Sequence, residues 1–367
     1  MTNHDQSKED ATVVYTDPLE ALEQILREGL PDNADLTSLF STNEGKQFAE
    51  NVENQKQFTL TGTTFQMVIE LFFRVVPRLA SVFSNGGFKD WWNQQIGSDP
   101  DIDEKGKKAL MQFPEMMELA LSQDDTKEAE APLDFIELFG ERTRERFIGA
   151  MVFSLHSYAQ AYIDSVIESL VRDDSTRAEF LESCDSRRIL QRLSLSELNE
   201  AAVDKYGVIA ELVRRSLPSG LLKRMKAVCQ ALGYQKELDK VIRSRSLDKV
   251  DDDFQYFCDW RNRIAHGDPA PDLKQYVSEV TPTAWDDLTK SIREWFHGFW
   301  PIPPEEVEAL IELGFEWAKS TSVLDFFLAL DGLTKMVLLF PALFDFVVSM
   351  AKQKTLPTAP DGAEPTE

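Results

Sequence analysis

The segment 259–268, DWRNRIAHGD, brings an arginine, an asparagine and a histidine close together in the chain. These residue types suit the cleavage of RNA through the ribose 2′-OH. A histidine side chain can exchange a proton near neutral pH, so His266 is a candidate to take the proton of the 2′-OH or to give one to the leaving 5′ oxygen. Arg261 can hold a phosphate by two hydrogen bonds and stabilise the charge that grows in the transition state. Asn262 can orient the phosphate or the imidazole, and the chemistry needs neither a metal nor a cofactor.

The helical positions of these residues do not by themselves assemble a site. The pattern predicts a helix over 251–266 that Gly267 closes. Asn262 and His266 share one face, whereas Arg261 lies about 140° from His266, because each of five steps turns the helix by about 100°. Three solutions stay open: the long arginine wraps around, the helix unwinds at Gly267, or a second copy of the segment completes the site. The C-terminus of a helix favours the protonated imidazole, which suits the acid role.

At these residues the chain resembles the HEPN superfamily, whose nucleases are small helical bundles with an Arg-x(4–6)-His motif. The form Arg-Asn-x-x-x-His-Gly is similar to the branch called RiboL-PSP-HEPN, and FSLHSYAQAYIDSVIESL resembles the first long helix of that branch. The resemblance covers roughly residues 145–300. It implies Arg261, Asn262 and His266 as the catalytic residues, RNA as the substrate, and a homodimer that brings two motifs together. The structural alternative is that His266 ends a helix and Arg261 forms an ion pair.

Two polar residues of the long helix are candidates for a supporting role. His156 lies beside the apolar stripe of that helix, and Gln160 follows it one turn later on the same face. We expect His156 to be a structural, hydrogen-bonding residue, with support of the site as the alternative. HEPN relatives often carry Glu where Gln160 stands, so this chain departs from the family there.

The net charge of −24 argues against general electrostatic binding of nucleic acid. However, residues 187–249 hold 14 basic and 7 acidic side chains, which makes this segment a candidate polyanion site. The candidate RNA-binding residues flank the break at 218–220. They are Arg214, Arg215, Lys223, Arg224 and Lys226. The alternatives are that these residues are solvated helix faces or that they pair with the acidic N-terminal block.

The apolar periodicity predicts an all-α fold, a HEPN-like helical bundle with additional helical N- and C-terminal blocks. Helices are expected over about 17–27, 64–83, 105–121, 144–172, 194–216, 221–232, 251–266 and 283–296, with two or three more after 303. The expected organisation is a disordered N-terminus (1–15), an acidic helical domain (16–130), the HEPN-like domain (141–300), a helical extension (301–353) and a disordered tail (354–367). The polar run 123–132 is the expected linker.

The remaining features bound the function. Cys184, Cys229 and Cys258 are widely spaced, so the sequence predicts neither a zinc site nor a disulfide framework. A polar N-terminus and an apolar tract of only 15 residues over 336–350 predict a cytoplasmic protein with no membrane span. We expect a metal-independent endoribonuclease in a defence or toxin-like role, with a regulatory protein or antitoxin as a possible further partner. The alternative is a non-catalytic module that binds RNA or protein.

Overall fold

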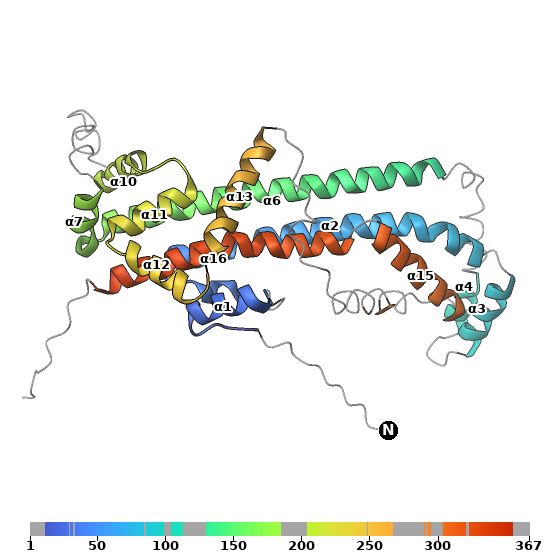
Figure 1. The fold of residues 1–367 in the computed structure, drawn as a ribbon. Helices are drawn as coiled ribbons and strands as arrows, with labels where there is room; N and C mark the ends of the chain where they lie inside the picture. The colour runs from blue at the N-terminus through green and yellow to red at the C-terminus, as the bar shows by residue number, and fades with distance from the viewer. Residues whose placement is uncertain are drawn as a thin grey trace, which may run out of the picture. The chain divides into compact units, whose positions relative to one another are not determined.

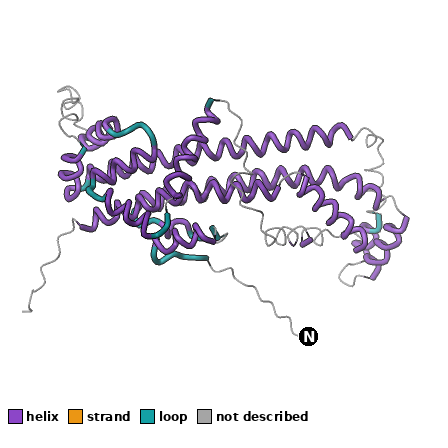
Figure 2. The backbone as a smooth tube through the Cα atoms, in the orientation of Figure 1, coloured by secondary structure: helices purple, strands orange, loops and turns teal. Residues whose placement is uncertain are grey.

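A computed structural model describes residues 12–28, 30–31, 34–83, 86–98, 104–112, 130–184, 204–247, 249–266, 290, 293–294, 304–320 and 323–354. Over these residues the secondary structure is helical, and the one extended pairing is an isolated bridge between Val13 and Ala34 (Figures 1 and 2). The all-α prediction is confirmed. The helices are α1 (Pro18–Glu28), η1 (Leu36–Leu39), α2 (Asn43–Phe83), α3 (Gly86–Ser98), α4 (Glu104–Leu110), α6 (Glu130–Arg172), α7 (Asp174–Ser183), α10 (Lys205–Ser216), α11 (Leu221–Ala231), α12 (Gln235–Ser244), α13 (Lys249–Ala265), α15 (Pro304–Ser320) and α16 (Val323–Lys354).

The chain divides into two compact units, and each unit combines segments that are far apart in the sequence. The first contains residues 1–57, 149–271 and 331–367, and the second contains residues 58–148 and 272–330. These units differ from the consecutive ranges expected from the sequence. The reason is that α2, α6 and α16 are long enough for each to contribute residues to both units.

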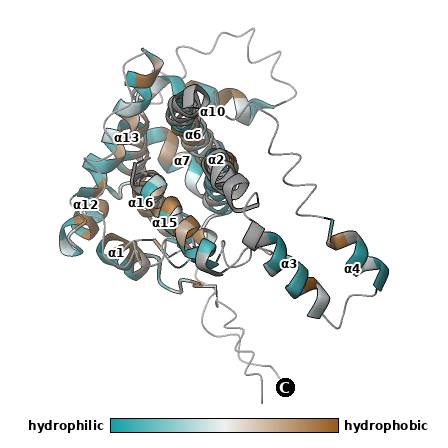
Figure 3. Cartoon of the chain, turned by 90° about the vertical axis from the view of Figure 1, so that its right-hand side faces the viewer, coloured by the Kyte–Doolittle hydropathy of each residue, from teal (hydrophilic) through white to brown (hydrophobic). Residues whose placement is uncertain are grey.

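The core of the first unit forms around α6. The apolar stripe expected on this helix is buried, including Met151, Leu155, Ile163 and Ile167 at no more than 1% exposure. Helix α11 packs against α7, α12 and α13. Apolar residues of α13 and α16 join this core, since Phe254 and Phe340 stack with their ring centroids 5.7 Å apart. The short helix α12 is largely hydrophilic (Figure 3) and buries only Leu238 and Ile242.

A buried carboxylate holds the N-terminus of α2. Asp345, on α16, is fully buried and accepts hydrogen bonds from the backbone N–H groups of Ser41 (2.7 Å) and Thr42 (3.0 Å). The Thr42 hydroxyl also donates to it, as does the Tyr162 hydroxyl of α6 at 2.9 Å. A side chain at Gly45 would collide with this carboxylate and with the Phe40 ring. The carboxylate thus satisfies free N–H groups at a helix end, where negative charge is also favoured.

The second unit has a buried ion pair between α2 and α6. The Arg144 guanidinium donates through Nη1 to both carboxylate oxygens of Glu70, at 2.9 and 3.1 Å, and Gln66 donates to the same carboxylate. The two helices approach closely beside this pair, because a Cβ at Gly62 would lie 3.0 Å from the Phe147 ring. A small residue at 62 is therefore part of the packing.

Several helix bounds differ from the sequence predictions. Helix α2 begins at Asn43 rather than near 64. The sequence did not predict the first half of this helix, because that half buries only a few apolar residues, such as Phe48 and Val52, among many polar ones. Helix α6 begins at Glu130, within the run expected to be a linker. Residues 12–15 were expected to be disordered, yet the Val13 carbonyl accepts a 2.9 Å hydrogen bond from Asp35. Most of the helix expected over 283–296 and the tail after 354 lie outside the described residues.

The C-terminal part of α16 is more extensively apolar than the tract at 336–350 suggests. Residues Ala329–Lys354 have a mean hydropathy of 1.7 in their most apolar window, and they are long enough to cross a membrane by length and composition. However, 72% of that window is buried inside the protein. The core helix of a soluble protein has the same properties, so this helix is weak support for a membrane span.

Replacing Asp345 by alanine is expected to lower the free energy of unfolding by about 3 kcal/mol, because four donors, three of them buried, lose their acceptor. Tyr162→Phe, which removes one of the four, should cost about 1 kcal/mol. Urea unfolding followed by circular dichroism measures both. Equal stability of the two variants would show that the carboxylate is not the main support of this helix end.

Candidate functional site

The candidate site lies at the C-terminal end of α13. The sequence places Asp251 and Asp252 in the first turn of this helix, where negative charge is favoured, and Phe254, Phe257 and Trp260 on its buried face. The last helical residue is Ala265. The His266 backbone N–H then donates to the Asn262 and Arg263 carbonyls, at 3.1 and 3.0 Å. The helix therefore keeps its form through Arg261 and Asn262, and Arg261 and position 266 lie about 140° apart around it.

The Arg261 side chain extends from α13 onto α6. Its guanidinium carbon lies 5.5 Å from the centroid of the Phe153 ring, a cation–π contact. Nη1 donates to the Asn262 side-chain oxygen at 3.2 Å, whereas Nε is buried and has no hydrogen-bond partner in the described part of the chain. The two helices are close at this level, since a Cβ at Gly149 would lie 3.8 Å from the Ile264 side chain. Arg261 thus presents a charged group with a free donor in a partly buried position.

His156 lies one turn after Phe153 on α6 and is partly buried. Its ring packs against Phe257 of α13, with 6.2 Å between the centroids. Burial lowers the pKa of His156 below its ordinary value, and the positive charge of Arg261 lowers it further. Among the described residues, no hydrogen-bond partner is found for either ring nitrogen. The structural, hydrogen-bonding role expected for His156 therefore has no contact to support it in the described part of the chain.

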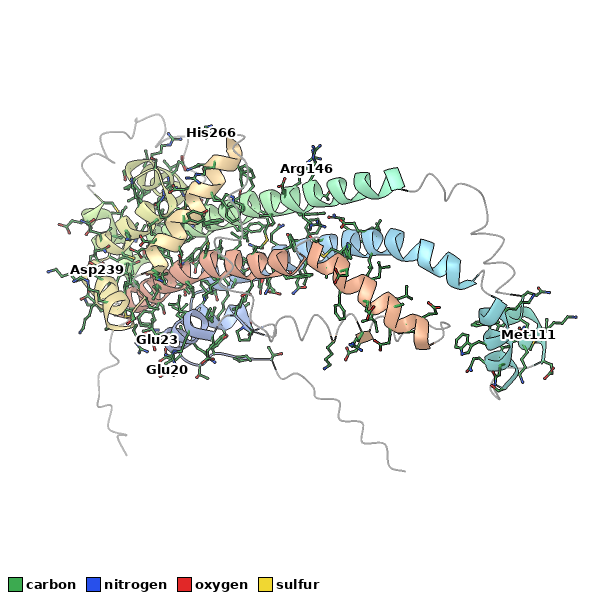
Figure 4. All side chains as sticks on the ribbon, turned by 45° about the vertical axis from the view of Figure 1, so that its right-hand side comes forward. Glu20, Glu23, Met111, Arg146, Asp239 and His266 are labelled. Carbon is green, nitrogen blue, oxygen red and sulfur yellow. The ribbon has the colours of Figure 1, made fainter. Side chains whose placement is uncertain are left out.

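His266 and Asn262 are exposed, and Figure 4 shows His266 at the end of α13. In the described part of the chain, no contact joins the His266 ring to Arg261. The sequence left three ways to bring Arg261 and His266 together. The first does not occur, because the Arg261 side chain contacts Phe153 and does not wrap toward His266. For the second, unwinding of the helix at Gly267, the structure shows that α13 is regular through Ala265. What the structure brings together is Arg261 with Phe153 and His156. The segment that follows, from Gly267, lies outside the described residues.

Gln160 takes part in a separate polar cluster. Its amide donates to Asp164 one turn later, at 2.9 Å. Asp164 also lies 3.6 Å from Arg214 of α10 and 3.6 Å from Arg224 of α11. Gln160 thus orients a carboxylate that connects three helices.

Four of the five candidate RNA-binding residues are paired with acidic side chains. Arg214 contacts Asp164, Glu168 and Glu211, and donates to the Asp164 carbonyl at 3.2 Å. The pairs of the other three are Arg215 with Glu211, Arg224 with Asp164, and Lys226 with Asp251. Lys223 is exposed. The acidic partners belong to α6, α10 and α13, and none belongs to the N-terminal block.

The three cysteines do not supply a nucleophile. All are buried and free. Burial raises the pKa of Cys184 to about 11, and those of Cys229 and Cys258 to about 12, so the thiols stay protonated at neutral pH. In the described ranges, no three His, Cys, Asp or Glu side chains are grouped as metal ligands would be.

Sequence reasoning missed the aromatic part of the site. No role was expected from the sequence for Phe153 or Phe257, yet Phe153 contacts Arg261 and Phe257 packs against His156. The available signal was spacing, because Phe153 precedes His156 by one turn and Phe257 precedes Arg261 by one turn. The sequence could not predict the packing of α13 on α6 that brings Phe153 and His156 next to Phe257 and Arg261.

Comparisons with known proteins provide no family assignment: no family model, no curated protein and no solved structure matches this chain.

Replacing Arg214 by glutamine should lower the free energy of unfolding by about 1–2 kcal/mol, because its partners Asp164 and Glu168 are only partly exposed. The matched control is Arg215→Gln. This exposed neighbour pairs only within its own helix, so the change should stay within about 0.5 kcal/mol. Urea unfolding of both variants checks the difference, and an Arg214 variant as stable as wild type would contradict a structural role for this network.

Proposed function

We propose that this protein is a metal-independent endoribonuclease of the HEPN type that cleaves RNA by attack of the ribose 2′-OH. The observation that carries the proposal is the Arg261 side chain, whose buried Nε lacks an acceptor among the described residues, on a helix that an exposed His266 follows directly. A buried guanidinium donor without a partner is costly, and a phosphate oxygen is the acceptor that fits it best. A solvent-accessible imidazole at a helix C-terminus suits proton transfer to a bound substrate.

Each residue of the motif has a defined part in this reaction. Arg261 binds the phosphate and stabilises its added negative charge as the 2′ oxygen attacks phosphorus. The P–O5′ bond breaks, and protonated His266 donates a proton to the leaving 5′ oxygen, which gives a 2′,3′-cyclic phosphate and a 5′-OH. Asn262 fixes the Arg261 guanidinium through the 3.2 Å hydrogen bond. No metal ion takes part in these steps.

A non-catalytic binding module is the second candidate, and the pairing of the basic residues favours it. Arg214, Arg215, Arg224 and Lys226 already have acidic partners, so an RNA that used them would have to displace those carboxylates. Such a module would bind RNA or a protein through the same bundle. Cleavage activity in the presence of EDTA separates the two candidates.

The proposal includes further expectations about the biological setting. We expect a homodimer, with Arg261 of one copy and His266 of the other acting on the same RNA, because positions 261 and 266 lie about 140° apart around a regular helix and Arg261 contacts Phe153. We also expect a role in defence or as a toxin. The expected further partner is a regulatory protein or antitoxin, and the expected location is the cytoplasm.

His266→Ala is expected to abolish RNA cleavage measured with EDTA present. Because the side chain is exposed, the helical circular-dichroism signal and the melting temperature should stay close to wild type. Arg263→Ala, another exposed residue of the same helix, is the matched control and should keep its activity. Cleavage at the wild-type rate by the His266 variant would reject the catalytic role of His266. Unfolding of that variant would contradict the exposed position of His266 at the end of α13.

A mixture of Arg261→Ala chains with His266→Ala chains should regain part of the activity after subunit exchange, because some mixed dimers hold one intact pair. Cleavage by each variant alone and by the mixture is compared at equal total protein. Light scattering measures the mass in parallel. A mass of one chain at micromolar concentration would rule out the shared site.

A further inference from the structure

We propose that His156 is a second catalytic histidine, which takes the proton from the ribose 2′-OH while Arg261 beside it holds the phosphate. This inference rests on the proposed ribonuclease function and adds a base, a residue outside the Arg261–His266 motif. It gives one chain both the group that binds the reacting phosphate and the group that activates the nucleophile.

The first support is that Arg261 holds a buried donor without an acceptor, close to the His156 ring. Among the described residues, Nε of Arg261 is buried and has no hydrogen-bond partner. The His156 ring is partly buried, lies near enough for the Arg261 charge to lower its pKa, and has no hydrogen-bond partner in the same part of the chain. Buried polar groups in folded proteins are nearly always hydrogen-bonded, so the unpaired Nε indicates an absent ligand. The ligand must accept hydrogen bonds, and it must carry negative charge because Arg261 is a cation.

The second support is that the two groups are held in place by their neighbours. Phe153 on α6 carries the Arg261 guanidinium on its face, at 5.5 Å, and Phe257 on α13 packs against the His156 ring, at 6.2 Å. Each helix thus contributes one aromatic residue and one polar residue, and each aromatic residue supports the polar residue of the other helix. This arrangement fixes the arginine and the imidazole before a substrate arrives, as an efficient site requires.

The third support is the protonation state. Burial and the Arg261 charge both lower the pKa of His156, so its imidazole is neutral at neutral pH and can accept a proton. Arg261 is the charged group that faces it from α13. On α6, Asp164 lies two turns further along and is engaged by Gln160, Arg214 and Arg224. His266, exposed at the end of α13, is left with the role of the acid, so the two histidines divide the roles of base and acid.

The proposed step balances without any other reactant. The 2′ O–H bond breaks and its proton passes to His156, while the 2′ oxygen forms a bond to phosphorus. The P–O5′ bond breaks, and the 5′ oxygen takes a proton from His266. The products are a 2′,3′-cyclic phosphate and a 5′-OH, with one proton gained by His156 and one lost by His266.

The first experiment compares cleavage of single-stranded RNA by the full-length wild type and by His156→Asn across pH. Wild-type kcat/KM should fall on the acidic side as His156 becomes protonated. In the variant we expect a loss of about a hundredfold or more and no acidic limb in the pH profile. Ser157→Ala, an exposed neighbour on α6, is the matched control and should keep the wild-type profile. Unchanged cleavage with an unchanged profile in His156→Asn would overturn the inference while leaving the ribonuclease proposal intact.

The second experiment needs no cleavage and no variant of His156. The pKa of the His156 ring is followed by NMR of histidine-labelled protein, with and without inorganic phosphate. Phosphate should raise this pKa, since an anion beside the ring favours its charged form. Arg261→Met should remove the effect, and Arg263→Met should keep it. If phosphate leaves the His156 resonances unchanged, Arg261 and His156 do not form an anion-binding site. A protein that binds phosphate here but cleaves no RNA would reject the ribonuclease proposal and the base role with it.

Discussion

The N-terminus of α2 depends on one buried carboxylate, and much of the first unit is arranged around it. Asp345 accepts hydrogen bonds from residues about 300 positions away in the chain and from Tyr162 of α6. Burial and the nearby carboxylate raise the pKa of Tyr162 well above its ordinary value, so its hydroxyl remains a donor. Phe48 stacks on the Tyr162 ring at 5.1 Å, and Phe344 meets it edge-on at 5.8 Å. One polar centre inside an aromatic cluster thus fixes α2, α6 and α16 relative to one another at this point.

This constraint reaches the candidate site through α6. His156 precedes Tyr162 by six residues on the same helix. The hydrogen bond from Tyr162 to Asp345 fixes the rotation of α6 about its axis, and this rotation decides which residues of α6 face α13. Glu44, one residue into α2, supports the same end: hydrogen bonds from Ser169 and Lys352, together with the charge of Lys352, outweigh its burial and lower its pKa. A helix held firmly at one end can present Phe153 and His156 in fixed positions to Arg261.

The sequence predicted the elements that bury a continuous apolar stripe and missed those that do not. The period of α6 was readable because Met151, Leu155 and Ile163 are all core residues, whereas α12 buries only Leu238 and Ile242. The Arg261–His266 motif was also readable, because its chemistry is local in the chain. Its relation to His156 depends on which turn of α13 packs on which turn of α6. Spacing within one helix carries no information on that register, so the pairing could be found only from the structure.

The acidic composition has a consequence for how this protein can meet an anion. Most of the candidate basic side chains on α10 and α11 already pair with carboxylates of α6, α10 and α13, which weakens their attraction for RNA over a distance. If the protein binds RNA as proposed, recognition depends more on short-range contacts at places where a cation has no acidic partner. Arg261 is such a place in the described part of the chain: its charge contacts an aromatic ring and an amide oxygen, not a carboxylate. The net negative charge of the protein repels RNA and weakens its binding at most of the surface. It does not remove the hydrogen-bond donors of Arg261 between α6 and α13, so a phosphate can still be bound selectively at this one place.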